Sequence, residues 1–169
     1  MWTNRGKRRP PFAVEPAEGQ ESVWDYPRPP VLLADCRLIE IYSANQLVAR
    51  SDANDRVCET ASPPTFYVPA DQVDWRLLVT IEGTTYCEWK GQARYWALKT
   101  DPSLPVAWNY PKPRAAFARI TNFVSFYPGQ VSCTVDGEQV RAQSGGFYGG
   151  WITDEIVGPF KGEPGTGNW

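Results

Sequence analysis

Short runs of alternating hydrophobic and polar residues occupy the middle of the chain. In one run Val131, Cys133 and Val135 alternate with Ser132 and Thr134, and this period of two places the hydrophobic side chains on one face of a β-strand. Cys133 is therefore expected to be a core thiol. Other short runs rich in β-branched and aromatic residues also predict strands, at residues 36–42, 46–50, 56–60, 65–68, 76–81, 84–87, 94–99 and 123–127.

Residues typical of turns separate several of these runs. Residues 44–45 (Ala-Asn) and 136–137 (Asp-Gly) are two-residue turns that favour hairpins between the runs on either side. Residues 128–129 (Pro-Gly) form a third turn, because proline fixes φ and glycine allows positive φ. This third turn predicts a further hairpin, between residues 123–127 and 131–135.

Helix is predicted mainly at one place. Pro113 suits the first turn of a helix, and Phe117 and Ile120 are spaced to share one helix face. Residues 113–120 are therefore predicted to be a short helix, and residues 71–74 a single turn. The fold class that follows is mainly β, a compact antiparallel domain with one short helix.

Composition divides the chain into three zones. Residues 1–30 hold six of the 16 prolines and form an extension in which Trp24 and Tyr26 are expected to dock on the rest of the protein. Residues 31–142 are expected to be the folded β domain. Residues 143–169 hold eight of the 14 glycines together with five aromatic residues. Because a flexible linker would not carry so many rings, this tail is expected to wrap the domain.

Charge and hydropathy exclude several classes of protein. The net charge is −2, yet the first ten residues carry four basic side chains and no acidic one, so the remaining body is acidic. An acidic body argues against nucleic acid as a partner. No apolar run approaches the ~20 residues that span a bilayer, and no apolar segment follows the basic start as it does in a secretory signal peptide. We therefore expect a cytoplasmic protein with no membrane partner.

The absence of histidine excludes several chemistries at once. Without histidine the chain has no Ser-His-Asp or Cys-His machinery, no histidine-held haem and no histidine-ligated zinc. The four cysteines are widely spaced and form no C-x-x-C pair, so a zinc ribbon is not expected and the thiols are expected to be reduced. No metal site and no cofactor is predicted.

Several motifs, taken in order, resemble the domain-of-unknown-function family 427. They are Glu59-Thr60 before Pro63-Pro64, Cys87-Glu-Trp-Lys-Gly91, Val106-Ala-Trp-Asn-Tyr-Pro111, Phe126-Tyr-Pro128 and Val135-Asp-Gly137. The resemblance covers about residues 36–140, and the flanks resemble a longer subgroup with N- and C-terminal extensions. It implies a compact β domain of the Mss4-like, or β-tent, type.

The same family is sometimes labelled a nucleotidyltransferase domain, family 9, so the resemblance also implies nucleotidyl transfer. The carboxylates in this chain fit that activity poorly. Such enzymes hold two Mg²⁺ ions with acidic residues one position apart. Asp154 and Glu155, which follow Gly149-Gly150, are adjacent instead, and adjacent residues of a strand point to opposite faces.

A polar cluster at Cys87 and Lys90 is the first candidate for chemistry. In an extended chain Cys87 and Lys90 lie on opposite faces, but Gly91 permits a bend that returns Lys90 over a pocket. A lysine near a thiol favours the thiolate and creates a nucleophile without histidine. Glu59 is a candidate base or structural clamp beside them. The alternative is that Cys87 is a core side chain and that the charged residues are solvated.

An aromatic group is the second candidate. Tyr95 alternates with Trp96, so one ring is expected to point inward and the other outward. Rings that border a pocket stack on a planar or sugar-like ligand, while Lys90, Lys112 or Arg114 meets an anionic group. The alternative is that the rings fill a small β core. The residues expected to bind a ligand are Tyr67, Lys90, Tyr95, Trp108 and Tyr110.

Three functions remain open from the sequence. The first is a binding module for a small anionic or aromatic molecule, which we favour. The second is an enzyme, either one that uses Cys87 activated by Lys90 or a nucleotidyltransferase. The third is an interaction domain whose tail at residues 143–169 docks on a partner or a second copy. Either a monomer or a homodimer is compatible with all three.

Overall fold

The computed structural model describes residues 4–169. Three 3-10 helices are present in this part of the chain, η1 (Ala70–Gln72), η2 (Trp75–Leu77) and η3 (Ala115–Asn122). The remaining regular structure is β, so the predicted mainly β fold class is confirmed. The strands are β1 (Glu21–Ser22), β2 (Val31–Asp35), β3 (Ile39–Ser43), β4 (Gln46–Ser51), β5 (Asn54–Glu59), β6 (Ser62–Pro69), β7 (Leu78–Cys87), β8 (Gly91–Leu98), β9 (Asp101–Asn109), β10 (Phe123–Phe126), β11 (Ser132–Val135), β12 (Glu138–Gln139), β13 (Arg141–Ala142), β14 (Trp151–Ile152) and β15 (Ile156–Val157).

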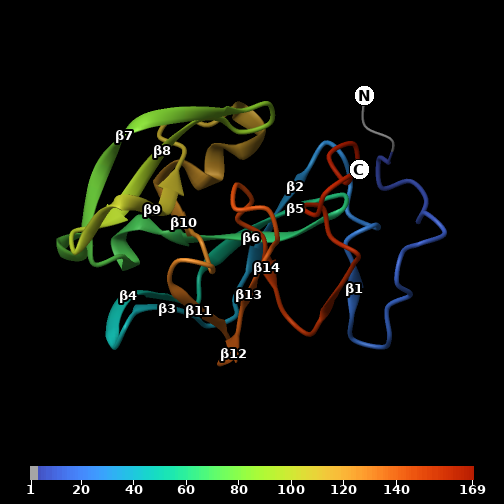
Figure 1. The fold of residues 1–169 in the computed structure, drawn as a ribbon, viewed down its shortest axis with the longest axis horizontal. Helices are drawn as coiled ribbons and strands as arrows, with labels where there is room; N and C mark the ends of the chain where they lie inside the picture. The colour runs from blue at the N-terminus through green and yellow to red at the C-terminus, as the bar shows by residue number, and fades with distance from the viewer. Residues whose placement is uncertain (1–3) are drawn as a thin grey trace.

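The larger sheet has seven antiparallel strands in the order β2-β5-β6-β10-β9-β8-β7 (Figure 1). Strand β10 joins its two halves, because Val124 pairs with Val68 of β6 and Ser125 pairs with Trp108 of β9. This insertion brings β6 close to β9, although 31 residues lie between the two strands in the sequence. The side chains of these two strands can therefore contribute to one site.

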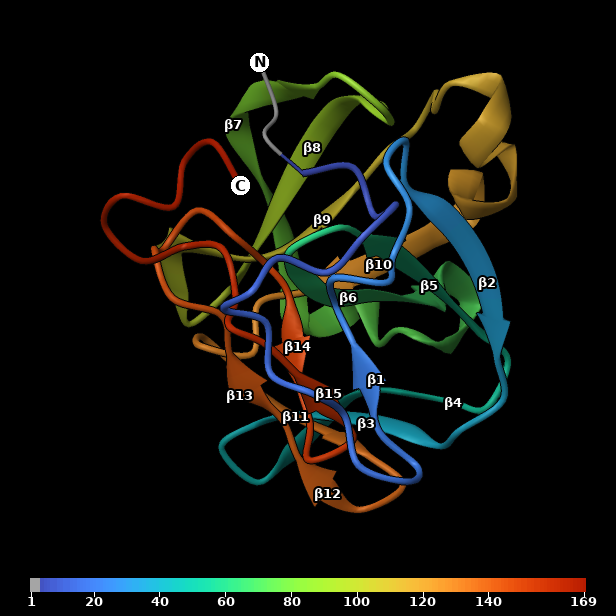
Figure 2. The same cartoon turned by 90° about the vertical axis from the view of Figure 1, so that its right-hand side faces the viewer.

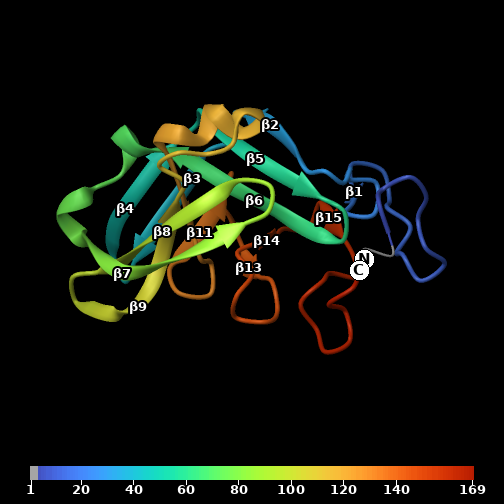
Figure 3. The same ribbon diagram turned by 90° about the horizontal axis from the view of Figure 1, so that it is seen from above.

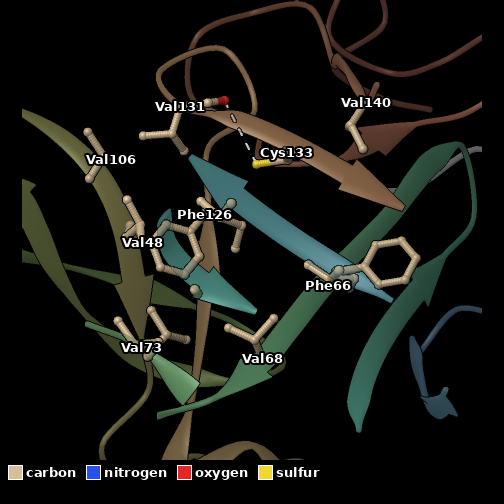
Figure 4. Close-up of a cluster of buried hydrophobic side chains, with 14 of the residues drawn as sticks. Val48, Phe66, Val68, Val73, Val106, Phe126, Val131, Cys133 and Val140 are labelled. Atoms are coloured by element: carbon tan, nitrogen blue, oxygen red, sulfur yellow. Dashed lines mark hydrogen bonds between the residues drawn. The ribbon is translucent and has the colours of Figure 1, made fainter. Parts of the chain in front are cut away.

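The smaller sheet has four antiparallel strands in the order β12-β11-β3-β4 and lies below β6 in Figure 1. The main hydrophobic core fills the space between the two sheets. In the close-up of Figure 4 the side chains of Phe66, Val68, Val106 and Phe126 from the larger sheet meet those of the smaller one. Cys133 is fully buried there, as the alternation of residues 131–135 predicts.

One predicted hairpin is wrong. Tyr127 to Gln130 form the predicted turn, with the Gln130 N–H donating to the Tyr127 carbonyl. The strands on its two sides nevertheless belong to different sheets, because β10 pairs with β6 and β9 whereas β11 pairs with β3. The turn therefore carries the chain from one layer to the other. The other two predicted hairpins form, β3 with β4 and β11 with β12.

The predicted helix at residues 113–120 is a 3-10 helix, η3, shifted two residues along the chain. Phe117 interrupts its helical backbone, but Phe117 and Ile120 are both buried on one face as predicted. They pack on the face of β6 opposite the main core, beside Tyr67, Trp108 and Tyr110. In Figure 3 η3 lies along the upper edge of the molecule, near β2 and β5.

The N-terminal extension and the C-terminal tail lie side by side (Figure 2). Strand β1 pairs in parallel with β15, and Phe12 stacks on Trp169 with ring centroids 5.0 Å apart. Trp24 is 1% exposed and Tyr26 is 8% exposed, so both rings are anchored in a third hydrophobic cluster. Within residues 4–169 no helix is long and apolar enough to cross a membrane.

Candidate functional site

One cavity of about 310 Å³ is lined by all seven residues that the sequence predicts as catalytic or ligand-binding. Its walls come from three parts of the protein: the face of the larger sheet on which η3 packs, the loop between β7 and β8, and the C-terminal tail. The aromatic residues Tyr67, Tyr95, Trp108 and Tyr110 lie in these walls, and so do Cys87, Lys90 and Glu59. The structure thus brings together side chains from β5, β6, β7, β8 and β9.

The aromatic wall follows from the register of the sheet. Tyr95 of β8 pairs with Trp108 of β9, and β10 places β9 next to β6, which carries Tyr67. The Tyr67 and Trp108 rings meet edge to face with centroids 6.3 Å apart, and Trp108 also contacts Tyr127 at 4.4 Å. Trp96, one residue after Tyr95, packs instead on Trp75, as the alternation predicts.

Lys90 lies in the tight loop between β7 and β8, where Cys87 pairs with Gly91. Gly91 has a φ of +101°, which L side chains rarely adopt, so a glycine is needed to close this loop. The Lys90 carbonyl accepts a hydrogen bond from the Arg114 N–H at 3.1 Å, which fixes the loop against the chain before η3. Lys90 therefore points into the cavity from an anchored backbone.

The Lys90 ammonium lies against aromatic faces. Its Nζ is 5.6 Å from the centroid of Tyr110 and 5.9 Å from that of Phe117, within the range of a cation–π interaction. Burial alone would lower the pKa of Lys90, but the electrostatic effect of the groups around it outweighs burial and raises the pKa. Lys90 is thus a protonated cation that lies against two aromatic rings at the cavity.

Tyr67 is the most deeply placed polar side chain of the cavity. The residue is fully buried, and its hydroxyl has no hydrogen-bond partner among residues 4–169. Burial raises the pKa of Tyr67, so the hydroxyl remains a neutral donor. A buried hydroxyl without a partner is unfavourable by about 1–3 kcal/mol, and a polar ligand atom in the cavity would satisfy it.

Glu59 is a clamp in this structure. Its Oε1 accepts a hydrogen bond from Arg28 Nε at 3.1 Å, and the Arg28 side chain is only 3% exposed. Arg28 also donates to the carbonyls of Asn4, Thr60 and Trp169, so it ties the two ends of the described chain to the end of β5. This arrangement favours the structural role that the sequence left open for Glu59.

Cys87 ends strand β7 and is partly buried in the cavity wall, near Lys90. Of the other cysteines, Cys58 and Cys133 are buried in hydrophobic clusters and Cys36 is exposed. Cys87 is therefore the one cysteine thiol that lines the cavity among residues 4–169.

The C-terminal tail contributes cavity residues that the sequence did not identify. The tail folds over Trp108 and contributes Gln143 from its start and Lys161 from farther along. The density of rings and glycines predicted that the tail wraps the domain, but no spacing rule placed it over the same cavity as Lys90. The tail residues that line the cavity are Gln143, Phe147, Tyr148, Gly149 and Lys161.

Two features named in the sequence lie outside the cavity. Lys112 is exposed and Arg114 donates to the Tyr86 hydroxyl at 2.8 Å, so neither joins the cavity wall. Asp154 pairs with Arg141, whereas Glu155 pairs with Arg37. No group of three histidine, cysteine, aspartate or glutamate side chains among residues 4–169 is arranged to hold a metal ion.

Comparison with known proteins gives one finding. The family model labelled NTP_transf_9 and described as a domain of unknown function, DUF427, matches residues 31–137. No curated protein matches the chain. The matched segment includes all seven cavity residues expected from the sequence and excludes the tail with Lys161. Because the match covers more than half of the chain and agrees with the motifs in the sequence, the protein belongs to the DUF427 family.

Proposed function

We propose that the protein binds a small, planar, anionic molecule in the aromatic cavity. The observation that carries this proposal is the juxtaposition of the Lys90 ammonium and the partnerless Tyr67 hydroxyl deep in one cavity. Both groups are donors, and a carboxylate or a phosphate oxygen accepts hydrogen bonds from both. The anionic end of the ligand therefore lies between them.

The walls favour a planar group at the other end. Tyr95 and Trp108 line the cavity, and the Trp108 ring is already held in place by Tyr67 and Tyr127. Rings that are fixed before binding lose little conformational entropy on contact. A volume of about 310 Å³ accommodates a compact molecule and is at the lower end of the range for ligand pockets.

The proposal is tested with benzoate as the probe, because benzoate combines one carboxylate with one aromatic ring. Binding to the folded state raises the melting temperature, and the rise grows with the logarithm of ligand concentration over Kd, so benzoate is expected to raise the melting temperature of the wild type. Lys90→Ala is expected to remove most of this rise. The matched control is Lys112→Ala, which removes a lysine outside the cavity and should keep the full rise.

A second function is favoured by one observation, the position of Cys87 beside Lys90 in the cavity. A thiol near a fixed cation is the arrangement of a nucleophilic cysteine. Iodoacetamide at neutral pH should then alkylate Cys87 faster than a model thiol, and Lys90→Ala should slow the reaction. Alkylation of Cys87 no faster than the model thiol speaks against this enzyme and leaves the binding proposal intact.

A further inference from the structure

Lys161 is a second lysine of the cavity, and the proposed function does not use it. It follows β15 in the C-terminal tail and lines the cavity together with Lys90. The residue is only 6% exposed, and lysine is rarely buried to this extent. Its Nζ lies 6.0 Å from the centroid of the Tyr148 ring.

The backbone of Lys161 is held on both sides. Its N–H donates to the Ala61 carbonyl at 2.7 Å, in the turn between β5 and β6. Its carbonyl accepts a hydrogen bond from Gln143 Nε2 at 2.6 Å, and the same Gln143 amide accepts from the Gly150 N–H through Oε1 at 3.1 Å. The side chain therefore enters the cavity from a fixed position, as a reactive group requires.

The charges around Lys161 differ from those around Lys90. Arg28, Glu59 and Glu88 are among the groups that act on it, and Glu59 also pairs with Arg28. Burial and the Arg28 charge lower the pKa of Lys161, although Glu59 and Glu88 partly oppose them. Its neutral, nucleophilic form is thus more accessible than that of an exposed lysine. The pKa of Lys90 is raised and that of Lys161 is lowered, although both line one cavity. Such opposite shifts are typical of sites in which one group acts as an acid and another as a nucleophile.

We propose that Lys161 forms a Schiff base with an aldehyde or ketone group of a planar, anionic ligand. This inference rests on the proposed function, because Lys161 lines the same cavity in which Lys90 and Tyr67 are proposed to hold the anionic end of the ligand. A lysine that is desolvated beside another cation is an established way to make an amine nucleophilic. The inference adds a substrate class to the site: small aromatic oxo-acids and aldehydes that carry a carboxylate or phosphate.

The reaction balances without a further reactant. The lone pair of neutral Lys161 Nζ attacks the carbonyl carbon, a C–N bond forms, and the π electrons of the carbonyl move to oxygen. Proton transfer from nitrogen to oxygen gives a carbinolamine. Protonation of the carbinolamine hydroxyl lets it leave as water. Loss of the remaining nitrogen proton then gives the neutral imine. Amine and carbonyl therefore become imine and water, with no change in oxidation state.

The test uses 4-carboxybenzaldehyde, which is benzoate with an added aldehyde. The intact protein is incubated with a substoichiometric amount, the imine is reduced with borohydride, and the modified lysine is identified by peptide mapping. Because burial and the Arg28 charge lower the pKa of Lys161 and so raise the neutral fraction of its amine, Lys161 is expected to be labelled several-fold faster than exposed Lys112. Excess benzoate is expected to slow labelling of Lys161 and not of Lys112.

Each outcome decides between the two proposals. Preferential labelling of Lys161 in the wild type supports the Schiff base. Lys161→Met should then lose this label, and Lys112→Met should keep it at Lys161. Labelling spread over the exposed lysines, or concentrated at Lys90, overturns it, and the mapping on wild type gives this answer even if Lys161→Met does not fold. A melting-temperature rise with benzoate but no selective label leaves the proposed function standing alone. Selective labelling that benzoate does not slow contradicts the shared anion site.

Discussion

Gly149 lies directly against the indole of Trp108, with no room between them for a β-carbon. The Trp108 ring itself is fixed between Tyr67 and Tyr127. The tail therefore follows the cavity wall at the closest distance that a backbone allows. This contact joins the C-terminal tail to the residues that the sequence identifies as the site.

We predict that Gly149→Ala loosens the tail. The added methyl group would lie well inside van der Waals contact with the Trp108 ring, and such overpacking destabilises by about 1–3 kcal/mol. Gly167→Ala is the matched control, because its new β-carbon meets nothing within 4 Å. Urea unfolding and the rate of limited proteolysis in the tail measure the effect. Equal behaviour of the two variants would show that the tail does not press on Trp108.

Tyr67→Phe is expected to separate stability from binding. The change removes a buried hydroxyl that has no partner, so stability should stay the same or increase, by up to about 1–3 kcal/mol. The rise in melting temperature with benzoate should shrink, because the ligand loses a donor. Denaturant unfolding of the free protein and thermal melts with benzoate measure the two effects.

The control for this prediction is Tyr26→Phe. The Tyr26 hydroxyl donates to Glu21 at 2.6 Å, so its removal should destabilise the protein by about 1–3 kcal/mol. A loss of stability in Tyr67→Phe as large as that in Tyr26→Phe would mean that the Tyr67 hydroxyl has a partner in solution.

Arg28 is expected to be the most important charged residue for stability. Its buried guanidinium bonds Glu59 and three carbonyls that hold the extension and the tail. Removing one partner of such a buried pair destabilises by about 3–5 kcal/mol, so Arg28→Met should lower the free energy of unfolding by that amount. Arg50→Met is the control, because Arg50 is exposed and its 3.6 Å pair with Glu40 contributes about 0–1 kcal/mol. Comparable losses in the two variants would be inconsistent with this role.

Stability is expected to fall in alkali because of Cys58. Burial raises the pKa of its thiol from 9.0 to about 12. Between these values the folded protein keeps a proton that the unfolded chain releases, so the free energy of unfolding decreases as pH rises, by at most about 1.4 kcal/mol per pH unit for this group. Burial also raises the pKa of Tyr110 and of Tyr127, which adds to the same slope.

The free energy of unfolding is measured with urea between about pH 8 and pH 11, because the thiol of an unfolded cysteine loses its proton in this range. Cys58→Ala should be less sensitive to pH than the wild type, whereas Cys36→Ala, which changes an exposed thiol, should match it. An unchanged slope in Cys58→Ala would assign the alkaline loss to the other buried groups whose pKa burial raises, Cys133 and the tyrosines.

The strands that the sequence missed show where the patterns failed. Strand β9 contains Pro102, Pro105 and two polar residues in its first half, a composition that argues against a strand. It pairs with β8 through two register shifts, which accommodate these prolines. Strand β2 is an edge strand whose VLLAD sequence has no alternation. In both cases tertiary pairing decides the structure rather than local preference.

The turn at residues 128–129 shows a different limit. Its chemistry predicted a turn correctly, yet a turn does not determine which strands pair, and here it connects two sheets. The candidate site was more predictable, because motif residues from five strands converge on one cavity. Lys161 was not predictable in this way, since its place depends on how the tail packs over Trp108 and Ala61.

The most direct test of the central claim is a crystal structure of the protein soaked with benzoate. The account predicts the ring between Tyr95 and Trp108, with the carboxylate within hydrogen-bond distance of Lys90 Nζ and Tyr67 Oη. Benzoate bound only at exposed basic side chains, with the cavity unchanged, would contradict it.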